Sequence, residues 1–197
     1  MAAPVIGIVG GIGSGKSLVA KEFARHGGVI IAGDQLGHEA LRQQSIKAQV
    51  VDRWGKTILD GAGNIDRRRL ASIVFGDIGE RAALEAMTHP YIGARIREEI
   101  AKAHAAPSVH LIVLDAALLL EAGWHDVCSH VVFVDAPQDV RLQRLQERGW
   151  SAGDVEVREK AQLSLAEKRR RADAVIENAK GPEQIAAQVN ELLAQWK

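Results

Sequence analysis

The stretch GGIGSGKS, residues 10–17, decides how this chain folds. It matches the pattern G-x-x-x-x-G-K-[ST] at every fixed position. A short apolar run, residues 5–9, precedes it, and a segment compatible with a helix begins at Lys16. A glycine-rich loop between a strand and a helix is an arrangement that binds phosphate groups. The sequence therefore predicts a phosphate-binding loop (P-loop) in an α/β fold.

Each residue type in this loop has a physical role in binding a nucleotide. Glycines let the backbone N–H groups come close to phosphate oxygens, because no Cβ atom stands in the way. Lys16 can reach the β- and γ-phosphates of ATP, and the Ser17 hydroxyl can bind Mg²⁺. The alternative is a glycine-rich turn that binds nothing. The residues expected to bind the nucleotide are Gly11, Ile12, Gly13, Ser14, Gly15, Lys16 and Ser17.

Five short runs of apolar and β-branched residues predict buried parallel strands. They cover residues 5–9, 29–31, 111–114, 131–134 and 174–176. Helical segments alternate with them, at residues 16–26, at 137–148 and after Pro182. This alternation predicts a three-layer α/β fold of the P-loop NTPase type with a five-stranded parallel sheet.

Two stretches interrupt the alternation. Residues 33–107 contain no clear strand and hold several helical patterns, including 81–87 and 92–105, so a helical insertion is expected there. Residues 149–171 are polar and heavily charged and occupy the place of a lid. The nucleotide-binding core is then expected to comprise residues 1–32, 108–148 and 172–197.

Composition excludes several classes of protein. The 197 residues carry 25 basic and 25 acidic side chains, and this zero net charge argues against a nucleic-acid partner. The single cysteine excludes a disulfide framework or a cysteine metal cluster within one chain. The longest apolar run, residues 111–120, is too short to cross a membrane. With no signal-like N-terminus, a cytoplasmic protein without a membrane partner is expected, of undetermined oligomeric state.

The zero net charge conceals a local imbalance around the expected lid. Residues 141–171 contain nine basic and five acidic side chains, an excess of four positive charges. Such an excess suits a small substrate that carries several phosphates.

Two acidic residues follow predicted strands. Because the carboxyl ends of parallel strands share one sheet edge, Asp34 and Asp115 should both face the P-loop. Asp34 is a candidate general base for an acceptor hydroxyl, or otherwise an N-cap of the next helix. Asp115 ends an apolar strand as a Walker-B carboxylate does and is a candidate Mg²⁺ ligand, or otherwise a cap or turn residue. Glu121 lies just beyond and is equally suited to a structural or a functional role.

The P-loop specifies a nucleotide but no reaction. An Asn-Lys-x-Asp motif, which reads guanine in GTPases, is absent from the sequence. A short chain with an insertion and a basic lid segment is typical of small-molecule kinases. Such an enzyme places a carboxylate by the acceptor, with Mg²⁺ and cations at the transferring phosphoryl group.

The chain resembles the dephospho-CoA kinase family, whose members phosphorylate the ribose 3′-hydroxyl of dephospho-CoA to complete coenzyme A. The resemblance covers nearly the whole chain. Its marks are residues 7–17, Asp34, His89-Pro90-Tyr91-Ile92, Leu118-Leu119 with Glu121, Arg144, Gln162 with Glu167-Lys168-Arg169, and Ala172-Asp173 with residues 175–178.

This resemblance implies a role for each matched residue. Asp34 corresponds to the catalytic carboxylate, and Arg144 to an arginine near the lid that faces the ATP phosphates. His89, Leu118 and Glu121 fall where the family binds dephospho-CoA, although His89 could also simply start a helix before Pro90. Residues 33–107 then form the helical CoA-binding domain, and ATP and Mg²⁺ are the expected cofactors.

The chain departs from the family pattern at four positions. Leu18 replaces a common Thr, Ala32 an acid, Ala117 a Pro and Leu120 an aromatic residue. The last three bear on the shape of the pocket more than on the groups that handle the phosphoryl group. Two alternatives stay open: a kinase for another nucleoside, nucleotide or small metabolite, and a nucleotide-binding switch without an acceptor.

Overall fold

The structure, a computed structural model, describes residues 2–179 and 181–196. Met1, Lys180 and Lys197, which belong to the predicted core ranges, lie outside the described residues. The chain divides into two compact units, one of Met1–Ala32 with Glu98–Lys197 and the other of Gly33–Arg97. They are called the core unit and the helical unit below.

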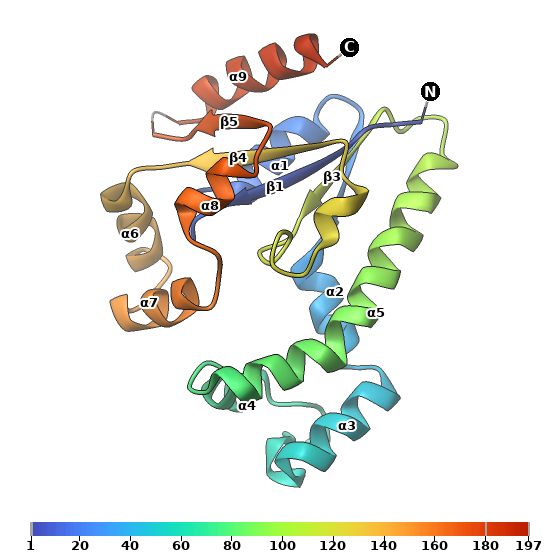
Figure 1. Ribbon diagram of the computed structural model, residues 1–197, viewed down its shortest axis with the longest axis vertical. Helices are drawn as coiled ribbons and strands as arrows, with labels where there is room; N and C mark the ends of the chain where they lie inside the picture. Colours follow the sequence, from blue (N-terminus) through green and yellow to red (C-terminus); the bar gives the residue numbers. More distant parts are fainter. Residues whose placement is uncertain (1, 180, 197) are drawn as a thin grey trace. The chain divides into compact units, whose positions relative to one another are not determined.

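The core unit is built on one parallel sheet (Figure 1). Its strands are β1 (Val5–Gly10), β2 (Gly28–Ala32), β3 (Leu111–Asp115), β4 (His130–Asp135) and β5 (Ala174–Glu177). All five predicted strands are confirmed, each one or two residues longer than expected. Their spatial order is β2-β3-β1-β4-β5, so the strand that carries the P-loop lies in the centre of the sheet.

Helices α1 (Lys16–Ala24) and α9 (Pro182–Gln195) contact each other and cover one face of the sheet (Figure 1). Every second residue of the strands points into this layer, as strand geometry requires. Ile6, Ile8 and Phe23 are fully buried there, and Trp196 stacks on the Phe23 ring. The apolar positions that recur along α9 explain this packing.

The opposite face is covered by the segment that follows β3, which includes the short helix η2 (Trp124–Val127), and by α8 (Leu165–Arg170), which contacts β1. Gly7 of β1 faces this layer. A Cβ atom there would lie 2.6 Å from a Leu119 methyl carbon and 2.8 Å from the Cys128 sulfur. The core unit therefore has the expected three layers.

Cys128 is expected to be chemically inert in the folded protein. Burial, with the nearby Asp126 and Asp173 carboxylates, raises the pKa of its thiol to about 12. Since the thiolate is the reactive form, alkylation by iodoacetamide at pH 8 should be at least about 100-fold slower than for free cysteine. Unfolding the protein in urea should restore the ordinary rate, and rapid labelling of the folded protein would contradict this environment.

The helical unit follows β2 directly in the chain. It contains α2 (Gly33–Ala40), α3 (Gln44–Trp54), the short helix η1 (Lys56–Ile58), α4 (Arg67–Val74) and most of α5 (Ile78–His104). The Asp66 side chain caps α4 by accepting hydrogen bonds from the backbone N–H groups of Arg68 and Arg69. The helical character predicted for this stretch is thus confirmed.

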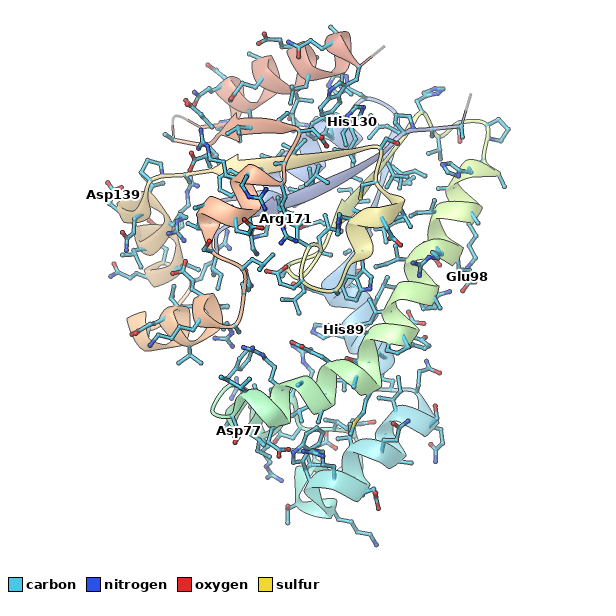
Figure 2. All side chains as sticks on the ribbon, viewed as in Figure 1. Asp77, His89, Glu98, His130, Asp139 and Arg171 are labelled. Atoms are coloured by element: carbon cyan, nitrogen blue, oxygen red, sulfur yellow. The ribbon has the colours of Figure 1, made fainter. Side chains whose placement is uncertain are left out.

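The two helical patterns expected at residues 81–87 and 92–105 form one helix, α5, with Pro90 inside it. Proline lacks the N–H group that an interior helix position donates, and its ring kinks or breaks a helix. Thr88, Ile92 and Ile96, spaced by four, are all buried, so one helix face continues past Pro90. Figure 2 shows α5 changing direction near His89. His89 therefore does not start a helix.

Candidate active site

The P-loop lies at the carboxyl end of β1, between β3 on one side and β4 on the other. This is the point at which the strand order reverses, where α/β proteins bind ligands. Gly15 is the N-cap of α1 and has φ 90°, and among the described residues no side chain caps this helix start. The first backbone N–H groups of α1 can therefore donate to an anion.

The loop is held tightly by its neighbours, which explains the glycines. A Cβ atom at Gly13 would lie 2.7 Å from the backbone oxygen of Arg141, and one at Gly15 only 2.1 Å from the Asn178 amide nitrogen. Asn178 is fully buried and donates to the Ser14 backbone oxygen at 2.7 Å. Asn178 carried no predicted role, although it belongs to the family marks, and it shapes the loop from the end of β5.

Lys16 lies over the loop that it follows. Its Nζ donates to the backbone oxygens of Gly10 at 3.1 Å and Gly11 at 2.9 Å. The ammonium group thus sits among the backbone atoms that would surround a phosphate chain. A cation at this position lowers the energy of phosphate oxygens close to the loop.

Ser17 and Asp115, from α1 and β3, meet at the edge of the P-loop. The Ser17 hydroxyl donates to Asp115 Oδ2 at 2.7 Å. Asp115 is the last residue of β3 and no helix cap, and β3 pairs with β1 so that Asp115 lies beside Ile8. The sequence predicted Ser17 from the P-loop and Asp115 from its strand-end position as Mg²⁺ ligands, and the structure brings the two side chains into contact.

Arg144 comes from α6 (Gln138–Gln146), which packs beside the P-loop. Its guanidinium donates to the backbone oxygens of Ser14 at 3.4 Å and Asn178 at 3.1 Å, and to the Asn178 side-chain oxygen at 3.4 Å. These acceptors are neutral, so they orient the guanidinium without cancelling its charge. Arg144 therefore lies beside the loop, and its contact with the ATP phosphates stays a prediction.

The segment 149–171 contains α7 (Ala152–Lys160) and α8. Together with the P-loop it encloses a cavity of about 150 Å³, lined by Gly11 and Ile12 on one side and by Glu159 and residues 162–165 on the other. The residues predicted to form a lid thus face the phosphate-binding loop within the core unit.

A buried ion pair anchors one end of this segment. Lys168, in α8, has a side chain only 2% exposed, and its Nζ lies 3.0 Å from Glu121 Oε1. The same Nζ donates to Gln162 Oε1 at 2.8 Å, and Glu121 also accepts a hydrogen bond from the backbone N–H of Leu163. Glu121 and the half-buried Leu118 lie in the segment after β3. Glu121 therefore ties α8 and its preceding loop to that segment.

Replacing Lys168 with Met should destabilise the protein strongly. The Glu121 carboxylate would remain largely buried without its cation, and breaking such a pair costs about 3 kcal/mol. Urea unfolding followed by circular dichroism measures this loss, and the exposed Lys160 replaced by Met is the matched control. An unfolding free energy equal to that of the control would contradict the anchoring role.

Asp34 is the second residue of α2 and lies exposed in its first turn. The N-cap interpretation is wrong, because α2 already begins at Gly33. His38 follows one turn later on the same helix. Burial and the nearby Arg67 lower the pKa of His38, while the Asp34 charge opposes them. Asp34 thus has a titratable neighbour that the sequence did not single out.

His89 is half-buried within the helical unit. Burial lowers the pKa of its imidazole, against the opposing charge of Glu85. The ring is therefore neutral at pH 7, and it would contact a ligand as a hydrogen-bonding group and not as a cation.

Six of the nine basic side chains in residues 141–171 pair with carboxylates. Lys168 pairs with Glu121, and Arg169 with Asp135, two acids outside that range. Arg170 and Arg171 share Glu167, whose pKa their hydrogen bonds lower to about 2. Few of these positive charges are therefore available to a substrate. For binding phosphates, the position of Arg144 beside the P-loop matters more than the number of basic residues in this range.

Comparison with known proteins places nearly the whole chain in one family. A family model described as dephospho-CoA kinase matches residues 4–184. Dephospho-CoA kinase from Latilactobacillus sakei is 41% identical over 192 residues, covering 95% of this chain and 93% of that protein. No described helix is long and apolar enough to span a membrane.

Solved structures agree on the fold. TT1252 from Thermus thermophilus superimposes with a TM-score of 0.81 at 35% identity, over all of both chains. Dephospho-CoA kinase from Campylobacter jejuni has the same fold, with a TM-score of 0.70 at 22% identity over 98% of this chain and 96% of that one. The chain belongs to the dephospho-CoA kinase family.

Proposed function

We propose that this chain transfers the γ-phosphoryl group of ATP to the ribose 3′-hydroxyl of dephospho-CoA, giving coenzyme A and ADP. The observation that carries this function is a complete P-loop at the central strand of a chain that matches the kinase family over residues 4–184. In the reaction, the bond between the γ-phosphorus and its bridging oxygen breaks, and a bond to the 3′-oxygen forms. The hydroxyl proton leaves to a base.

The kinase family implies ATP as a substrate, and the P-loop supplies its site. Backbone N–H groups of Gly11–Ser17 would bind the phosphates. Lys16 and Arg144, which both contact backbone oxygens of the loop, would offset the charge on the transferring group. The arrangement supports this, because Arg144 is held beside Ser14 by neutral acceptors.

The chemistry of Ser17 and Asp115 fits Mg²⁺. Hydroxyl and carboxylate oxygens are ligands that Mg²⁺ prefers, usually with one or two carboxylates and substrate phosphates completing its shell. The two side chains already contact each other at the edge of the loop. When bound there, Mg²⁺ would neutralise charge on the β- and γ-phosphate oxygens.

Residues 33–107 are proposed to bind the acceptor. Asp34 and His89 of this range would take part, together with Leu118 and Glu121 of the segment after β3. Asp34 would accept or orient the proton of the 3′-hydroxyl, because it follows the carboxyl end of β2 in the chain and is exposed. Neutral His89 would donate or accept a hydrogen bond. The Glu121 contacts with Lys168 and Leu163 favour a role in holding the segment after β3 against α8 and its preceding loop.

Residues 149–171 are proposed to act as a lid, and the remainder of the core unit as the nucleotide-binding domain. The lid position is supported by the cavity that Glu159 and residues 162–165 form against the P-loop. A lid at this place would exclude water from the transferring phosphoryl group.

Ranking acceptors by kcat/KM tests the proposed substrate. With Mg·ATP in a coupled ADP assay, kcat/KM for dephospho-CoA should far exceed kcat/KM for nucleoside monophosphates, nucleosides and shikimate. A different acceptor at the top of the ranking would assign another small-molecule kinase activity. Nucleotide binding without transfer to any acceptor would instead indicate a switch.

A further inference from the structure

Arg141 is a buried arginine that neither the P-loop pattern nor the family marks single out. It lies three residues before Arg144 in α6, so both side chains share one helix face toward the P-loop. Arg141 is only 7% exposed to solvent. An arginine this buried requires partners for its charge.

The partners come from the P-loop and from the lid. Arg141 Nη1 donates to the backbone oxygen of Ile12 at 3.1 Å and to Glu159 Oε1 at 2.5 Å. The same nitrogen lies 2.7 Å from where a Cβ atom of Gly11 would stand. The guanidinium therefore touches the phosphate-binding loop while it holds the lid helix α7.

The two members of this pair differ in exposure. The Arg141 side chain is 8% exposed and the Glu159 side chain 38%. Arg141 is thus buried beside the P-loop, whereas Glu159 on α7 is partly exposed to solvent. Two further contacts of α7 lie within residues 149–171: Lys160 pairs with Glu156, and the Arg158 guanidinium lies over the Trp150 ring.

The Lys168–Glu121 pair anchors the α8 end of the lid, and the Arg141–Glu159 pair joins the α7 end to the P-loop. We propose that Arg141 and Glu159 are positioning residues that set the lid against the P-loop during phosphoryl transfer. This inference rests on the proposed kinase function. The pair acts on the reaction by keeping α7 in place and water out, and neither residue needs to contact the phosphates.

Glu159→Gln tests the proposal, because it removes the charge and keeps the size of the side chain. We expect kcat for transfer to dephospho-CoA to fall at least about 10-fold, because α7 loses the charged contact that positions it against the P-loop. ATP affinity should be unchanged. ATP hydrolysis without acceptor, in which water takes the phosphoryl group and yields ADP, phosphate and a proton, should rise relative to transfer.

Two further variants separate positioning from folding. Glu156→Gln, on the same helix α7 with an exposed side chain, should retain the wild-type ratio of hydrolysis to transfer. Arg141→Met combined with Glu159→Gln should lower transfer no more than Arg141→Met alone, because both changes break one interaction. Hydrogen exchange of α7 should accelerate in Glu159→Gln and remain at the wild-type rate in Glu156→Gln.

Three results would overturn the proposal. Glu159→Gln could leave the ratio of hydrolysis to transfer and the exchange of α7 at wild-type values. It could instead bind ATP more tightly and transfer faster, which would mean that Glu159 restrains Arg141 from the phosphates. Additive effects of the two substitutions would show that the residues act independently. Failure of the wild-type protein to phosphorylate dephospho-CoA would reject the proposed function itself, separately from these outcomes.

Discussion

Replacing Asp34 with Asn should lower the turnover of dephospho-CoA by about 10²–10⁴-fold, the usual contribution of a general base. The amide keeps the size of the side chain and cannot accept the proton of the 3′-hydroxyl. Asp34 is exposed in the first turn of α2, so the protein should fold as before. Steady-state kinetics in a coupled ADP assay measure the loss, and the KM for ATP should stay unchanged.

Asp52→Asn provides the matched control, since Asp52 is an exposed acid of α3 in the same helical unit. It should retain wild-type turnover. If Asp34→Asn turned over within a factor of about two of that control, Asp34 would not be the general base, because a general base contributes far more than this.

Replacing Lys16 with Ala should abolish measurable phosphoryl transfer. The Lys16 ammonium lies over the backbone oxygens of Gly10 and Gly11, where the phosphate chain would bind. Its removal takes away a cation from the transferring group, and a single such electrostatic contact contributes about 10²–10³-fold to turnover. Loss of ATP affinity should add to this, because the same ammonium attracts the phosphates before the reaction.

Lys21→Ala is the control for this change, because Lys21 is an exposed lysine of the same helix α1. Calorimetric titration with ATP and the coupled assay should both report wild-type behaviour for it. If Lys16→Ala bound ATP and turned over like this control, the P-loop would have no part in the reaction.

The nucleotide site could be predicted from the sequence because its signals are local. A P-loop specifies its glycines, its strand and its helix within about a dozen residues, and Asp115 at the end of β3 contacts Ser17 of α1. The five strands could be predicted equally well, since parallel strands buried on both faces appear in the sequence as short apolar runs.

The remaining features depend on contacts between distant segments. Helix α5 continues past Pro90 because Ile92 and Ile96 extend its buried face. The burial of this face outweighs the local tendency of proline to end a helix. Lys168 and Arg141 look like solvated charges in the sequence, and only their partners Glu121 and Glu159 explain their burial. The strand order, too, follows from packing that no short motif encodes.

The most direct test of the proposed function is the product formed from dephospho-CoA and Mg·ATP. High-resolution mass spectrometry with phosphorus NMR should find a gain of one phosphate, located on the ribose 3′-oxygen, with one ADP for each molecule formed. The product should disappear in Lys16→Ala. Unmodified dephospho-CoA after prolonged incubation with the folded, ATP-binding protein would contradict the account.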